Sequence, residues 1–225
     1  MSGDSNLTST ALRTPKAAAV AGIVFSLLTA AIFWVMRASF PVQPETALAR
    51  LSYNATTITF AIGLVPFAGA AFLWFIGVLR DRIGQREDRF FATVFLGSGL
   101  LFLATLFVAA ATVGATVVAF ANVPAGSINL ETFVFVRNLA FTLMNVFAIK
   151  MAAVFMISTS MVIARTRAAP RYLAYLGASF GLLILLGSQW VDWSFLVFPT
   201  WVLLFSAQTL VDNFRRGVVS QPDIR

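Results

Sequence analysis

Long uninterrupted runs of apolar residues constrain the fold of this chain most. The run from Ala17 to Met36 holds 20 residues without a charge, and several later runs are at least as long. Runs of about 18 or more apolar residues are typical of membrane spans, because only helices and closed barrels satisfy their own backbone hydrogen bonds in lipid. Barrel strands would alternate in polarity, and these runs do not. The sequence therefore predicts an all-α, multi-pass membrane helix bundle.

Composition removes several function classes. Of 225 residues, 59% are hydrophobic and 11% charged, whereas a soluble domain has roughly 25% charged residues. The chain has no cysteine and no histidine, which excludes disulfides, Cys/His metal sites, haem ligation by these residues and histidine-based catalysis. We therefore expect no metal and no cofactor, and an enzyme is the least favoured function class.

Six apolar segments predict about six spans in a single transmembrane domain. A polar tail of residues 1–16 precedes them, and a second tail of residues 214–225 follows. The predicted spans are residues 17–38, 56–79, 90–121, 131–164, 172–190 and 194–213. The third and fourth are long enough to tilt or to project from the hydrocarbon. The last two are short and flank Asp192, so this hairpin decides between five and six spans. Pro44 looks like a helix start that extends the second span outward.

The distribution of basic residues predicts the orientation. With the N-terminus in the cytoplasm, twelve basic residues lie on that side, namely Arg13, Lys16, Arg80, Arg82, Arg86, Arg89, Arg165, Arg167, Arg171, Arg215, Arg216 and Arg225. The opposite side has Arg37 and Arg50, while Arg137 and Lys150 lie inside the fourth segment. This bias predicts that both termini are cytoplasmic. The preference for Arg over Lys indicates a bacterial inner membrane, and no basic segment is long enough for nucleic-acid binding.

The stretch between the second and third segments contains a recognisable pattern. Residues 77–86 read Gly-Val-Leu-Arg-Asp-Arg-Ile-Gly-Gln-Arg, which resembles the G-x-x-x-D-R-x-G-R-R loop signature of major facilitator superfamily transporters. The matching positions are Gly77, Asp81, Arg82, Gly84 and Arg86, and Gln85 departs from the pattern. The resemblance implies that Asp81 and Arg82 form a cytoplasmic gating pair and that Gly84 supports the turn. The alternative is a simple hairpin with a turn glycine and positive-inside arginines.

That resemblance covers about ten of the 225 residues. The chain also has half the usual number of helices of that family. A facilitator-like mechanism would therefore need a homodimer or a partner membrane subunit.

Lys150 is a candidate site residue because it lies near the middle of an apolar segment. A charge at the centre of a membrane helix costs about 2.5–3.5 kcal/mol on insertion scales. Three interpretations stay open. Lys150 snorkels to the outer interface, pairs with Asp192, or serves as the counter-charge of an anionic solute, lipid headgroup or partner subunit.

Two polar stripes predict a contact between the third and fourth segments. Asn138, Thr142 and Asn145 share one helical face, while Lys150 lies about 140° away from Asn145 in a regular helix. Ser98 and Thr105 begin a similar stripe on the third segment. Where the stripes meet, they form either a closely packed seam or a hydrated lane for a small solute.

Two further motifs have mainly structural interpretations. Gly177 and Gly181 frame Ser179 in a G-x-S-x-G pattern, but the hydrolase use of this pattern needs a histidine. We therefore expect a G-x-x-x-G packing face. Pro66 should kink the second span, which is compatible with gating and with static packing.

These features favour binding or passage of a small solute, ion or lipid between the third and fourth segments, in the lipid bilayer. The ligand-binding candidates are Lys150, Asn145, Thr142, Asn138, Ser98 and Thr105. The gating or structural candidates are Asp81, Arg82, Gly84, Pro66 and Asp192. The alternative function is a non-catalytic scaffold or regulatory subunit of a membrane complex, and in either case we expect a homo-oligomer or a partner subunit.

Overall fold

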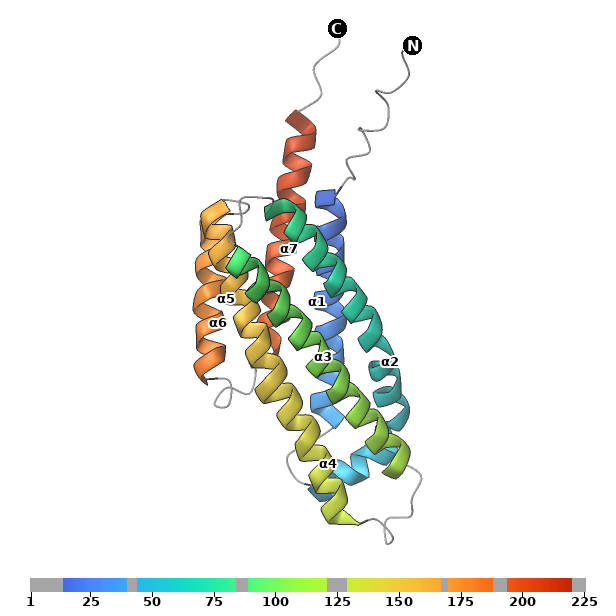
Figure 1. Ribbon diagram of the computed structural model, residues 1–225. Helices are drawn as coiled ribbons and strands as arrows, with labels where there is room; N and C mark the ends of the chain where they lie inside the picture. The colour runs from blue at the N-terminus through green and yellow to red at the C-terminus, as the bar shows by residue number, and fades with distance from the viewer. Residues whose placement is uncertain are drawn as a thin grey trace, which may run out of the picture.

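The computed structural model describes residues 14–39, 44–83, 89–120, 129–166, 170–187 and 194–219. These residues form helices and contain no strand, and the helices run side by side as one elongated bundle (Figure 1). Within them, five helices are long and apolar enough to cross a membrane, and one further apolar helix is shorter. The predicted class, an all-α multi-pass membrane bundle, is confirmed.

The helices follow one another in an up-and-down path. Their bounds are α1 Thr14–Ser39, α2 Pro44–Ile83, α3 Arg89–Phe120, α4 Leu130–Thr142, η3 Leu143–Ala148, α5 Ile149–Thr166, α6 Arg171–Gly187 and α7 Ser194–Val219. Here η3 is a π-helix that joins α4 and α5 into one rod. The chain enters α1 and leaves α7 at the same end of the bundle (Figure 1). The cytoplasmic assignment of that end stays a prediction.

Helix α2 is the longest element, with 40 residues. It begins at Pro44, where the fixed φ of proline suits a first turn and no backbone N–H is lost from the helix. It then continues through Pro66, whose ring is exposed on the outer face of the bundle. The second span is therefore the inner part of a rod about 60 Å long.

The centre of the bundle is a cluster of phenylalanine rings, and Phe72 of α2 is its hub. The ring of Phe72 lies 4.6 Å from Phe25 of α1, 5.5 Å from Phe102 of α3, 5.1 Å from Phe155 of α5 and 5.7 Å from Phe198 of α7, measured between ring centroids. All five side chains are fully buried. Tilted and edge-to-face pairs of this kind stabilise contacts beyond the area they bury. Five helices are therefore tied together at one level.

Helix α6 packs on α5 through two of its glycines. A Cβ atom added at Gly177 would collide with Ser160 Oγ, and one added at Gly181 would lie 3.0 Å from the carbonyl oxygen of Ala153. Ser179 is exposed between them. The predicted packing face is therefore confirmed, because small residues let the two backbones approach closely.

Phe72→Ala tests the role of the central cluster. We expect it to lower the free energy of unfolding by about 3 kcal/mol or more, because the substitution opens a cavity among four neighbouring rings. Phe67→Ala on the same helix is the matched control, since its ring is 67% exposed. Thermal unfolding of the purified protein in detergent measures both. Equal losses of stability in the two variants would contradict the central role of Phe72 in packing.

Gly177→Ala tests the α5–α6 seam. We expect a loss of about 1–3 kcal/mol in stability, because the new methyl group overlaps Ser160 and the Trp201 ring. Gly77→Ala is the control, since its added Cβ meets nothing within 4 Å. At that exposed helical position alanine should be neutral or stabilising by up to about 1 kcal/mol. The same unfolding measurement applies, and a stable Gly177→Ala protein would argue against the seam.

Candidate functional site

The rod that contains α4 and α5 is interrupted by a π-helical turn. Asn129 caps its start, where the side-chain oxygen accepts a hydrogen bond from the backbone N–H of Thr132 at 3.2 Å. At the end of η3, the backbone N–H of Ile149 bonds to the carbonyl oxygen of Met144, five residues earlier. The predicted span over residues 131–164 is present as one apolar rod, but the rod is π-helical between Leu143 and Ala148. Turns of this type are rare and occur frequently at functional sites.

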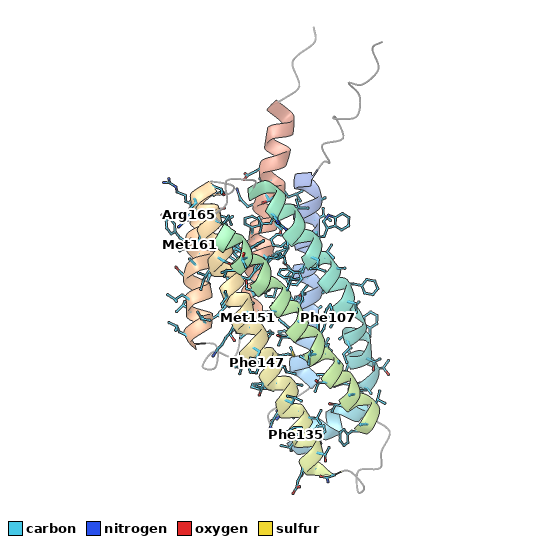
Figure 2. All side chains as sticks on the ribbon, in the orientation of Figure 1. Phe107, Phe135, Phe147, Met151, Met161 and Arg165 are labelled. Carbon is cyan, nitrogen blue, oxygen red and sulfur yellow. The ribbon has the colours of Figure 1, made fainter. Side chains whose placement is uncertain are left out.

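The π-turn shifts which residues face the interior. Phe147 lies seven residues after the buried Ala140 and would share its face in a regular helix. Instead Phe147 (Figure 2) is 54% exposed, and Ala148 is buried at 1% exposure. The wider turn therefore contains one residue more than a regular helix would need to return to the same face. As a result, the buried residues of α4 and α5 all face the interior of the bundle, although their spacing does not fit one regular helix.

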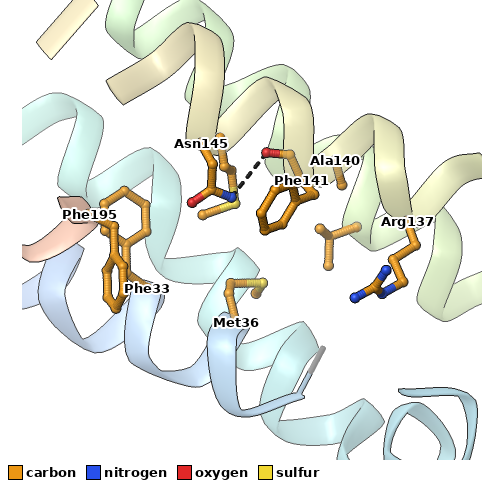
Figure 3. Close-up of a pocket in the computed structure, with 9 residues that line it drawn as sticks. Phe33, Met36, Arg137, Ala140, Phe141, Asn145 and Phe195 are labelled. Carbon is orange, nitrogen blue, oxygen red and sulfur yellow. Dashed lines mark hydrogen bonds between the residues drawn. The ribbon is translucent and has the colours of Figure 1, made fainter. Parts of the chain in front are cut away.

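A cavity of about 80 Å³ lies beside the π-turn, where α1, α3, α4, η3 and α7 meet (Figure 3). Its only polar lining residues among those described are Arg137 and Asn145. The apolar part of the lining consists of Phe33, Met36, Val113, Ala140, Phe141, Met144 and Phe195. Met36 lies near the end of α1 and Phe195 in the first turn of α7. The cavity is therefore in the half of the bundle remote from the chain termini.

Arg137 is the charged group of this cavity. Its side chain is half-buried, and Nη1 donates a hydrogen bond to Asn138 Oδ1 at 3.3 Å. This contact holds the guanidinium near its own turn of α4. A guanidinium is always protonated in proteins and presents several N–H donors in one plane. Within an apolar lining, its attraction for an anion is stronger than in water.

Asn145 is the second polar group, and its amide orientation is set by the helix. Nδ2 donates to the carbonyl oxygen of Phe141 at 3.0 Å. The side-chain oxygen is turned toward the Phe33–Phe195 pair (Figure 3), whose rings meet edge-to-face with centroids 5.9 Å apart. Asn145 therefore offers an acceptor to the cavity.

A second void of about 10 Å³ continues inward from the first. The two share Phe33, Met144, Asn145 and Phe195. The smaller void is closed by Phe102 and Phe198, two rings of the central cluster. Its volume corresponds to about one water molecule. The cavity system therefore ends at the phenylalanine hub.

The other predicted residues of the fourth segment lie away from this cavity. Asn138 and Thr142 are exposed, and Lys150 is half-buried but lines neither void. The snorkelling, ion-pair and counter-charge interpretations of Lys150 all stay predictions.

On α3, the predicted polar residues bond within their own helix. Ser98 is buried and donates to the carbonyl oxygen of Phe95 at 3.1 Å. Thr105 is half-buried and donates to that of Leu101 at 2.7 Å. Such local bonds satisfy the hydroxyls without a ligand. They suit the packed-seam interpretation of this stripe.

The gating candidates are only partly described. Asp81 and Arg82 belong to the last turn of α2, but their side chains lie outside the described residues. Gly84 and Asp192 also lie outside them. Pro66 faces away from both voids.

Arg137 is the site residue that the sequence analysis did not single out. Its signal is the spacing of Arg137, Ala140, Phe141, Met144 and Asn145, which follows the i, i+3, i+4, i+7, i+8 pattern of one helix face. The stripe through Asn138 and Thr142 is rotated by one residue toward the outside. Asn145 borders both stripes, and among the four candidates on this rod it is the one that lines the cavity, while its role in ligand binding stays a prediction.

Comparisons with known proteins give no further guide to this site. No protein-family model, no curated protein and no solved structure matches the chain. Among the described residues, no group of three or more Asp or Glu side chains gathers to hold a metal ion.

Cysteine labelling tests which side of the membrane the cavity faces. The chain contains no native cysteine, so single substitutions give a clean signal. Thr132→Cys, exposed at the start of α4, should react with a membrane-impermeant maleimide added to intact cells. Arg171→Cys, exposed at the start of α6, should react only after permeabilisation. The reverse pattern would invert the predicted orientation.

Proposed function

We propose that this membrane protein binds a small monoanionic solute in the cavity beside the π-turn. The observation that carries the proposal is that Arg137 and Asn145 line one cavity whose other walls are apolar. Concave, mostly apolar sites with a few placed polar groups are typical of small-molecule binding. The guanidinium supplies the attraction, and the apolar walls exclude competing water.

The volume of the cavity limits the size of the solute. One ordered water needs roughly 10–15 Å³, so about 80 Å³ accommodates roughly five to eight water-sized groups. This is the range of short-chain carboxylates. A complete phospholipid is too large for this space, which favours a solute over a lipid.

The charge of the lining favours a monoanion. Arg137 is the single cationic side chain among the described lining residues. A second negative charge on the ligand would be left in apolar surroundings without a counter-charge, and burying an uncompensated charge is costly. A carboxylate therefore suits the site better than a phosphate dianion.

Binding fits the architecture better than open passage. The inner void ends against Phe102 and Phe198. Both rings contact Phe72, whose cluster fills the centre of the bundle. The solute would enter from the side opposite the termini, which the positive-inside rule assigns to the outside of a bacterial inner membrane.

Arg137→Met tests the proposal, with Lys150→Met as the matched control. Both variants remove one positive charge from the same rod, but Lys150 lines neither void. We expect Arg137→Met to weaken binding of radiolabelled butanoate to protein in nanodiscs by roughly 10- to 150-fold, because a hydrogen bond to a charged group is lost. Lys150→Met should bind like the wild-type protein.

Three results would contradict the proposal. They are absence of saturable binding for any one- to five-carbon carboxylate, equal loss in both variants, and binding that Arg137→Met leaves unchanged. Release of a co-purifying membrane protein by Lys150→Met, without any solute binding, would instead favour a scaffold or regulatory subunit.

A further inference from the structure

We infer that the solute is linear and carries a hydrogen-bond donor at the end remote from its carboxylate. This inference rests on the proposed function and adds the chemical class of the ligand. The structure assigns the two ends of the ligand to different residues, with the carboxylate at Arg137 and the donor at Asn145. A hydroxyl or an ammonium group would serve as the donor.

The orientation of the Asn145 amide is the first argument. Its Nδ2 donates to the carbonyl oxygen of Phe141, and the reversed amide would place two acceptor oxygens against each other. The side-chain oxygen is therefore the group that faces the Phe33–Phe195 pair (Figure 3). An acceptor there attracts an O–H or N–H group and repels a second carboxylate.

The separation of the two polar groups is the second argument. Arg137 and Asn145 are eight positions apart, or about 12 Å along a helix axis. The bond from Arg137 to Asn138 keeps the guanidinium close to its own turn. Between the two polar groups the wall of the rod consists of Ala140, Phe141 and Met144. A ligand that contacts both ends must therefore place an apolar chain between its polar groups.

The surroundings of Asn145, where the end of the ligand remote from the carboxylate would lie, are the third argument. The Asn145 oxygen is turned toward the rings of Phe33 and Phe195, which line the same two voids (Figure 3), and aromatic faces attract cations. The neighbouring void of about 10 Å³ has room for one more water-sized group. A terminal hydroxyl or ammonium group therefore fits here, whereas a plain methyl group would leave the acceptor without a donor.

A ligand series on the wild-type protein provides the test. The probes are butanoate, 4-hydroxybutanoate, 4-aminobutanoate and succinate, measured by competition against radiolabelled butanoate in nanodiscs. We expect at least one of the two donor-bearing compounds to bind roughly 3- to 10-fold more tightly than butanoate, because one hydrogen bond is gained. Succinate should bind more weakly than butanoate, because its second carboxylate meets an acceptor.

Asn145→Leu assigns the preference to this residue. It removes the acceptor at similar volume, so butanoate and 4-hydroxybutanoate should then bind equally. Residual binding of butanoate that is lost in the Arg137→Met background shows that the variant is folded, whatever affinity it keeps. Thr142→Val is the matched control, because Thr142 is exposed on the same rod and lines neither void. It should leave the preference unchanged.

The outcomes separate the two proposals. If butanoate binds through Arg137 but neither donor increases affinity, this inference is wrong and the proposed function stands. A donor preference that persists in Asn145→Leu, or tight binding of succinate, also overturns the inference. If no probe binds in an Arg137-dependent way, the proposed function itself fails.

Discussion

Close contact between helices is the constraint on which this bundle depends, because lipid tails are as apolar as the side chains and give helices no reason to associate by burial alone. Two such contacts are a cluster of rings and a glycine seam. The ring of Phe72 joins α2 to α1, α3, α5 and α7, and the glycines of α6 let it approach α5 at backbone distance. Packing at the centre therefore closes the inner end of the voids beside the π-turn.

The candidate site exists because the rod of α4 and α5 does not stay regular. A continuous α-helix would turn Phe147 inward and Ala148 outward, and the bulky ring would occupy the space beside Phe33 and Phe195. The π-turn places the small alanine inside instead, at the cost of weaker local hydrogen-bond geometry. Asn145 keeps the regular helical spacing of Arg137, Ala140, Phe141 and Met144, so the π-turn leaves space beside a polar face that the helix already presents.

The helical class followed from the apolar runs, and the packing face of α6 followed from the spacing of Gly177 and Gly181, although its partner α5 did not. These features are local, so the sequence specifies them directly. The position of the cavity depended on which residues of the α4–η3 helix face the interior. The π-turn also has no sequence signature comparable to a proline or a capping residue. The stripe through Asn138 and Thr142 was therefore placed one residue away from the face that Arg137 occupies. Lys150 was singled out as a charge within an apolar segment, yet the cavity is lined by Arg137, the other cation of that segment.

The shortness of α6 has a mechanical consequence for the surrounding bilayer. Its 17 residues extend about 25 Å, less than the roughly 30 Å of a typical hydrocarbon core, whereas α2 and α3 on other sides of the bundle are much longer. The protein therefore presents a short apolar edge and a tall apolar edge to its surroundings, and a bilayer of uniform thickness cannot match both edges at once.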